Sequence, residues 1–217
     1  MRFLSTSCAA VAMAVAVSGI AAAQDFKPKQ AGDIVVRARG IGLLPNEGGV
    51  VRDRGTGADT GMRIGNITDE AVPELDFSYF VTPNLALELI AASARHSVTT
   101  SNGIDVGRVT HLPPTLTLQY HPLPQSRFSP YVGAGINYTW FFDEKAGPAG
   151  AVQNFDVQGT FGWAVQAGLD IAVSGGWSVN LDLKRLWLRP DVTTTALKVD
   201  NLRIDPWIIG AGVGFRF

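Results

Sequence analysis

Apolar residues alternate with small or polar ones along the last eleven residues, 207–217. The apolar positions are Trp207, Ile209, Ala211, Val213, Phe215 and Phe217. A period of two predicts a β-strand with one apolar face. An apolar stripe that ends on a terminal aromatic residue is typical of the closing strand of a bacterial outer-membrane barrel, because that strand faces lipid.

Seven more segments show the same alternation and predict strands at residues 33–40, 74–81, 85–94, 115–121, 131–142, 162–173 and 177–188. Short connections (82–84, 122–130 and 174–176) alternate with long ones (41–73, 95–114, 143–161 and 189–206). Tilted strands of about ten residues can cross a bilayer. We therefore expect an all-β fold, an eight-stranded antiparallel transmembrane β-barrel with short periplasmic turns and long extracellular loops.

The tryptophans fall near the ends of these predicted strands. Four lie at loop ends, namely Trp140, Trp163, Trp187 and Trp207, and Trp177 lies at a turn end. Amphipathic rings are enriched where a membrane meets water. We therefore expect these five side chains to mark the two membrane interfaces.

The beginning of the sequence predicts export. Arg2 precedes an apolar run at residues 9–20, which is too short to span a bilayer, and residues 21–23 offer an A-x-A cleavage site. We expect a signal peptide at residues 1–23 and an outer-membrane barrel at residues 24–217. The single cysteine, Cys8, would be removed with the signal peptide. A net charge of −1 gives no electrostatic case for nucleic acid as a partner.

Strand phase assigns two groups of side chains to the barrel interior. The lower, periplasmic group is polar and would form a plug, because unpaired buried charges are costly: Arg37, Glu88, Gln119, Asp170, Asp182, Lys184 and Arg216. The upper group is apolar and would line a hydrophobic lumen: Ile90, Ala92, Pro113, Leu186, Leu188 and Ile208. The alternative is that the apolar group is packing filler or reflects a phase error near the strand ends.

Several motifs in the same order resemble the OmpW family, which is similar to the alkane-uptake protein AlkL. They are HLPPTL at 111–116, PYVGAGINYTWFFD at 130–143, W-x-x-Q-x-G-x-D at 163–170, and DPW at 205–207 followed by FRF at 215–217. The resemblance implies a barrel with a hydrophobic lumen that passes small hydrophobic molecules by lateral exit into the membrane. Prolines near strand ends (Pro113, Pro114, Pro190 and Pro206) lack the donor for a ladder bond, so they could leave a gap for such an exit. The alternative, which the pattern favours, is that they simply start or stop strands. Residues 46–65 match no part of the family.

Three functions follow from these patterns. The first is passive uptake of small hydrophobic molecules, and the second is a structural or surface-recognition barrel, like a phage or bacteriocin receptor, without transport. The third, a barrel enzyme, would use His96 with Ser93 or Ser97, but no carboxylate lies at a suitable spacing. We expect His111 to form a hydrogen bond that fixes the base of a loop, and His121 to be solvated at a periplasmic turn.

We therefore expect no catalytic residues, no metal and no cofactor. The expected partners are the lipid bilayer and lipopolysaccharide, the outer-membrane insertion machinery through the strand that ends at Phe217, and small hydrophobic molecules.

Overall fold

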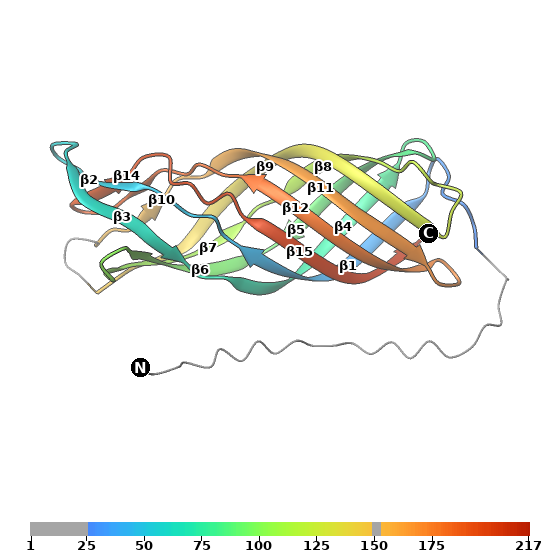
Figure 1. The fold of residues 1–217 in the computed structure, drawn as a ribbon, viewed down its shortest axis with the longest axis horizontal. Helices are drawn as coiled ribbons and strands as arrows, with labels where there is room; N and C mark the ends of the chain where they lie inside the picture. Colours follow the sequence, from blue (N-terminus) through green and yellow to red (C-terminus); the bar gives the residue numbers. More distant parts are fainter. Residues whose placement is uncertain (1–25, 149–152) are drawn as a thin grey trace, which may run out of the picture.

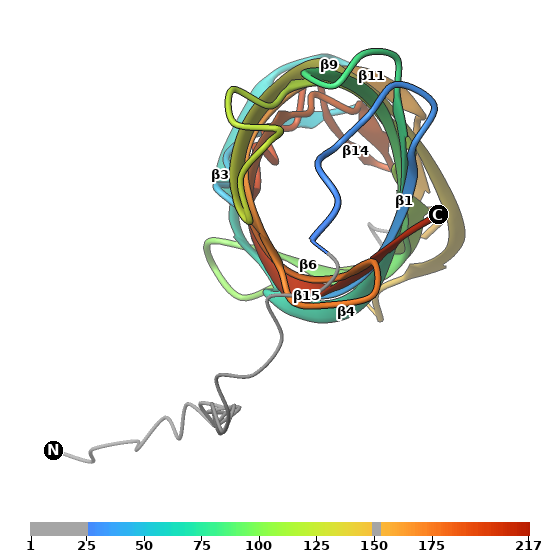
Figure 2. The ribbon, with the colours of Figure 1, turned by 90° about the vertical axis from the view of Figure 1, so that its right-hand side faces the viewer.

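The computed structural model describes residues 26–148 and 153–217, so the expected signal peptide lies outside the described residues. Its strands wind around a common axis and form a long, closed barrel (Figures 1 and 2). Among the described residues, no helix has the length and apolarity needed to cross a membrane. The first described residues and Phe217 lie at the same end of the barrel (Figure 1).

Eight antiparallel strands close the ring in the order β1-β4-β5-β8-β9-β11-β12-β15. Strands β15 and β1 complete it with ten registered pairs, from Val35↔Arg216 to Leu44↔Trp207. The predicted eight-stranded barrel is confirmed, with ends shifted by a few residues. The observed bounds are β1 Ile34–Leu44, β4 Glu70–Phe80, β5 Leu85–Ala92, β8 Thr115–Tyr120, β9 Phe128–Ala146, β11 Thr160–Ala172, β12 Trp177–Trp187 and β15 Trp207–Arg216.

The outward face of this ring is apolar, as a surface in contact with lipid must be. Leu75, Phe77, Leu87, Leu118 and Leu181 all point outward and are exposed. The five tryptophans also point outward, with exposed fractions from 39% at Trp187 to 69% at Trp163. Four of them belong to the end of the ring opposite the chain terminus, whereas Trp177 packs edge-on against Phe215 with ring centroids 5.0 Å apart.

The predicted long connections are confirmed, and they contain further strands. The additional strands are β2 Val50–Asp53, β3 Asp59–Ile67, β6 Ala94–Thr100, β7 Asp105–Leu112, β10 Asp156–Val157, β13 Val192–Thr193 and β14 Leu197–Val199. Together with the outer end of β9 they prolong the barrel beyond the four tryptophans (Figure 1). We call this part the extracellular extension.

In the extension the apolar side chains point inward, whereas in the membrane-spanning ring they point outward. Val51, Val98, Val106, Val109 and Leu202 face inward and form one buried apolar cluster with their neighbours. Outward positions carry polar side chains such as Arg63, Arg95 and Lys145. Because water rather than lipid surrounds this part, no outward apolar stripe reveals its strands in the sequence.

Candidate functional site

The lower half of the barrel interior holds a network of buried charges centred on two arginines. Arg37 on β1 is fully buried, and its guanidinium donates to both oxygens of Asp170 at 3.0 and 2.8 Å. It also donates to the Ser78 hydroxyl at 2.6 Å and to Glu88 at 3.2 Å. A planar fork of donors suits this geometry, since several carboxylate oxygens surround one cation.

Arg39 lies two residues further along the same face of β1 and gathers four carboxylates. Its nitrogens lie 2.9 Å from Glu74, 2.5 Å from Asp76, 3.4 Å from Glu88 and 3.4 Å from Asp182. Lys184 joins this group through Glu74 at 2.6 Å and Asp182 at 3.0 Å. The network therefore links strands from both sides of the barrel across its interior.

Tyr131 and a glycine complete the network. The Tyr131 ring is buried inside the barrel, and its hydroxyl donates to Asp182 at 2.7 Å. Its ring lies directly over Gly168, where a Cβ would collide with the phenol. The ring also lies 5.6 Å from the Arg37 guanidinium. Gly168 thus makes room for the aromatic side chain that bridges the charged layer.

The residues predicted to plug the lower lumen lie together in this layer, with one exception. Arg37, Glu88, Gln119, Asp170, Asp182 and Lys184 are all buried there, whereas Arg216 is partly exposed at the periplasmic mouth and pairs with Asp33 at 3.4 Å. Sequence reasoning missed Lys29, Arg39, Glu74 and Asp76. Strand phase could have found the last three, because each alternates with a lipid-facing residue, but nothing local marked Lys29.

Residues 26–33 form a strap across the periplasmic mouth (Figure 2). The Lys29 ammonium reaches into the barrel and lies 2.8 Å from Asp170, 2.9 Å from the Ser129 hydroxyl and 2.9 Å from His121 Nδ1. Its backbone N–H donates to the Pro124 carbonyl at 2.9 Å. His121 is therefore buried, and the expectation that water solvates it is wrong.

Above the charged layer the interior becomes apolar. Ile41, Leu43, Ala164, Leu186, Leu188 and Ile208 form a buried cluster. A space of about 370 Å³ lies between Ile90, Ala92 and Pro113 on one side and Leu186 and Ile208 on the other, with Glu74 and Lys184 at its floor. The residues predicted to line a hydrophobic lumen thus lie around this space or, for Leu188, just above it.

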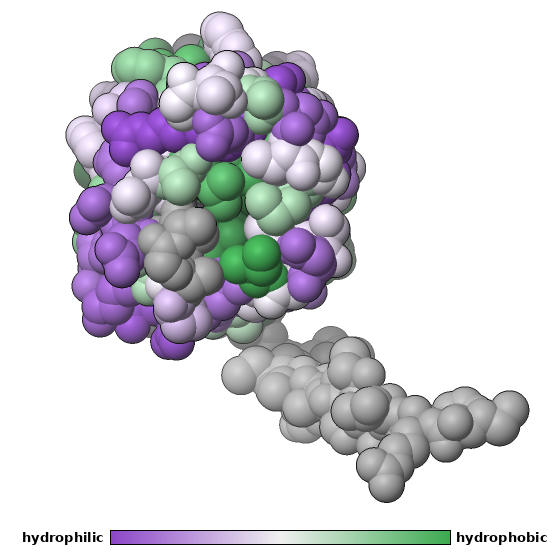
Figure 3. Space-filling model, turned by 90° about the vertical axis from the view of Figure 1, so that its left-hand side faces the viewer, coloured by the Kyte–Doolittle hydropathy of each residue, from purple (hydrophilic) through white to green (hydrophobic). Residues whose placement is uncertain are grey.

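A second, larger space continues upward into the extension. It encloses about 700 Å³, part of it open to solvent, and Leu43, Pro113, Leu186 and Ile208 line both spaces. Its upper wall includes Phe155 and other members of the apolar cluster of the extension. Seen from the extracellular end, hydrophobic residues lie inside an opening whose rim is largely hydrophilic (Figure 3). The two spaces share these wall residues, and we call them together the apolar path; Glu74 and Lys184 of the charged layer lie at its lower end.

Two histidines lie in the wall of the upper space. The rings of His96 on β6 and His111 on β7 stack with centroids 5.0 Å apart and planes inclined by 14°. Both belong to the extracellular extension, where burial lowers the pKa of His96 and lowers that of His111 to about 3. Both rings are therefore neutral at neutral pH, which keeps this wall uncharged.

The barrel wall is interrupted beside the apolar path. The β5–β8 ladder ends at Ile90↔Thr115, and the β6–β7 ladder starts at Ala94↔His111, so residues 91–93 and 112–114 form no ladder pairs with each other. Pro113 and Pro114 lie in this break and have no N–H to donate. The Asn137 amide covers their carbonyl oxygens, donating to Pro113 at 3.0 Å and to Pro114 at 3.2 Å. The Pro114 carbonyl also accepts a backbone hydrogen bond from Tyr138 at 3.2 Å, as the Pro206 carbonyl does from Leu186 at 3.2 Å.

The candidate enzyme residues do not form a catalytic pair. Nδ1 of His96 lies 2.7 Å from the Thr68 carbonyl oxygen, Ser93 points outward, and the Ser97 backbone N–H donates to the Thr68 hydroxyl. In residues 26–148 and 153–217, no group of three or more His, Cys, Asp or Glu side chains could hold a metal ion.

Comparisons with known proteins agree with this architecture. The model of the OmpW family matches residues 30–217, which include residues 46–65, so the expectation that this segment matches no part of the family is wrong. Outer membrane protein W of Escherichia coli is 34% identical over 221 residues, which cover 96% of this chain and 97% of that protein. Outer membrane protein AlkL of Ectopseudomonas oleovorans is 31% identical over 160 residues, 70% of this chain and 68% of its own.

Solved structures show the same barrel. The crystal structure of OprG from Pseudomonas aeruginosa superposes with a TM-score of 0.80 at 26% identity and covers 89% of this chain and 99% of its own. The structure of AlkL in lipid bilayers gives a TM-score of 0.65 at 27% identity and covers 92% of this chain and 96% of its own.

Proposed function

Because the chain belongs to the OmpW family and forms an outer-membrane barrel, we propose that it is a passive channel for the uptake of small hydrophobic molecules. The observation that carries this proposal is the apolar path through the extension and upper barrel, which ends on a layer of buried charges. A path with apolar walls and charged groups only at one end suits a small apolar ligand. The similarity to AlkL supports the same function.

The charged layer makes the periplasmic end a poor exit for an apolar molecule. Passing it requires separating buried ion pairs, and breaking one such pair costs about 3–5 kcal/mol. The break at Pro113 and Pro114 lies beside the apolar path, above the charged layer. We propose that the molecule leaves sideways through this break into the bilayer, with the upper lumen as its binding site and the charged layer as a plug.

The first test is uptake of a labelled medium-chain alkane or terpene by cells that lack other hydrophobe channels, with and without this protein. Leu186 lines both spaces and is buried. We expect Leu186→Asp to abolish the added uptake, because the carboxylate brings water and charge into the apolar path. Leu186→Met is the matched control, since it preserves volume and apolarity, and should leave uptake near that of the unchanged protein.

Folding is checked through the heat-dependent shift in electrophoretic mobility of the barrel, and Ile90→Asp supplies a second variant in the lower space. Added uptake that survives both substitutions in folded protein contradicts the proposal. It then favours the alternative of a surface-recognition barrel without transport. That alternative predicts loss of partner binding when residues 46–65, which include the β2–β3 hairpin, are deleted.

The barrel also implies partners at its surface. We propose that the outward aromatic residues contact the bilayer and lipopolysaccharide, and that the strand ending at Phe217 is read by the outer-membrane insertion machinery. Removal of residues 1–23 during export is part of the same proposal.

A further inference from the structure

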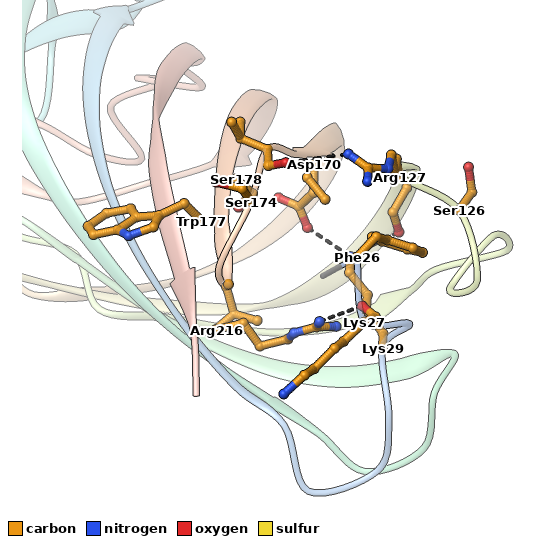
Figure 4. A pocket seen from close by; sticks show the side chains of 15 residues that line it. Phe26, Lys27, Lys29, Ser126, Arg127, Asp170, Ser174, Trp177, Ser178 and Arg216 are labelled. Atoms are coloured by element: carbon orange, nitrogen blue, oxygen red, sulfur yellow. Dashed lines mark hydrogen bonds and ion pairs between the residues drawn. The ribbon is translucent and has the colours of Figure 1, made fainter. Parts of the chain in front are cut away.

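Another pocket lies at the opposite end of the barrel, at its periplasmic mouth. It lies between the strap, the start of β9 and the turn between β11 and β12, and is open to solvent. Figure 4 shows Phe26, Lys27 and Lys29 of the strap between Arg127 and Arg216. This pocket plays no part in the proposed uptake path, because the charged layer separates the two.

Four cations line the pocket, and two of them lack a carboxylate partner among the described residues. Lys29 is satisfied by Asp170, and Arg216 lies 3.4 Å from Asp33. Lys27 and Arg127 form no ion pair with any described residue. Arg127 instead lies 5.7 Å from the Phe26 ring and donates to the Val173 carbonyl at 3.4 Å, which leaves further donors of its guanidinium free. The pocket therefore presents a positive charge with donors for an anion.

The walls indicate which kind of anion fits. The hydroxyl groups of Ser126, Ser174 and Ser178 also line the pocket, and hydroxyls and guanidinium groups are common ligands of phosphate oxygens. Apolar surface from Phe26, Val173 and Trp177 lies beside them. Val173 and Trp177 are exposed, at the level where interface aromatics meet lipid head groups. A phosphate that carries an acyl chain matches this combination better than a free ion does.

We propose that this pocket binds the phosphate of an anionic phospholipid from the periplasmic leaflet, with the acyl chains running along the barrel beside Val173 and Trp177. Lys27 and Arg127 supply charge to the phosphate, and the Ser126 and Ser174 hydroxyls donate to its oxygens. The bound head group then holds the strap against the turn between β11 and β12. This site is independent of what the lumen carries.

The test is native mass spectrometry of the purified full chain in detergent, titrated with phosphatidylglycerol, diacylglycerol or inorganic phosphate. We expect phosphatidylglycerol to bind, and Lys27→Gln combined with Arg127→Gln to weaken this binding by about tenfold or more, because two charged contacts to the phosphate are lost. The matched control combines Arg63→Gln with Lys145→Gln. It removes the same charge from exposed positions of the extension and should leave binding unchanged.

Three results overturn the proposal. Equal weakening by the control pair would show that only overall charge matters, and equal binding of diacylglycerol would show that the phosphate is not recognised. Displacement of phosphatidylglycerol by inorganic phosphate at similar concentration would assign the pocket to a free ion instead of a lipid. The heat-dependent shift in electrophoretic mobility confirms that the barrel of each variant is folded.

Discussion

Asp170 shows what a single residue contributes to the charged layer. Its carboxylate accepts from Lys29 of the strap, from Arg37 of β1 and from Asn180 of β12, at 2.8 to 3.0 Å. Removing its charge leaves two buried cations without their shared partner. We expect Asp170→Asn to lower the free energy of unfolding by about 3–5 kcal/mol, measured by urea unfolding in lipid vesicles with tryptophan fluorescence.

The control for this prediction is Asp200→Asn. Asp200 is half-exposed and lies 3.1 Å from Lys198 in the extension. Because solvent screens such a pair, this change should cost less than about 1 kcal/mol. An equally small loss for Asp170→Asn would mean that the interior pairs reorganise around the missing charge, contrary to the prediction.

At the scale of elements, the sequence predicts the membrane-spanning strands well and the extension poorly. Leu116 and Leu118 on β8, or Leu181 and Leu183 on β12, mark a strand because lipid requires an apolar outward face. In β6 the apolar residue Val98 points inward, and its neighbours are polar and half-exposed. That pattern also fits an ordinary loop with occasional apolar residues. Only pairing with β3 and β7 makes it a strand, and no single segment contains this information.

The break between β7 and β8 is an element whose function can be tested directly. Replacing Pro113 and Pro114 together by alanine restores two N–H donors, so the ladder beside residues 91–93 can close. We expect hydrophobe uptake to slow several-fold, while the amides of residues 91–93 gain protection in hydrogen exchange.

Pro190→Ala is the matched control, since Pro190 follows β12 and its carbonyl accepts a hydrogen bond from Leu202 away from the break. Its uptake should match that of the unchanged protein. If the double substitution protects the amides and uptake stays the same, the molecule leaves by another route.

At the scale of the whole molecule, strand phase predicts which side chains face inward but not how they pair. Arg37 and Asp170 are 133 positions apart, and Lys184 and Glu74 are 110 positions apart. Their pairing depends on the tilt and register of all eight strands, which alternation alone does not determine. For the same reason, the sequence does not predict the strap. Lys29 precedes every predicted strand, and only the closed barrel brings it to Asp170.

The periplasmic end of the barrel is closed at two levels, which the Lys29–Asp170 ion pair connects, and their roles can be distinguished by ionic conductance. The strap covers the mouth, whereas Arg39 and its four carboxylates span the interior above it. Since the second layer does not include the strap, replacing residues 26–30 by five Gly and Ser residues should leave conductance in planar bilayers at the level of the unchanged chain. Arg39→Ala should raise conductance, because Glu74, Asp76 and Asp182 then repel one another and draw water into the lumen.

The opposite conductance results would change the proposed exit route. If loss of the strap opens a steady ionic current and Arg39→Ala does not, the strap is the seal and the charged layer is permeable. An aqueous route to the periplasm would then exist, and lateral exit at Pro113 and Pro114 would no longer be required. Low conductance without the strap, together with fast hydrophobe uptake, places the seal in the charged layer and leaves the barrel wall as the way out for an apolar molecule.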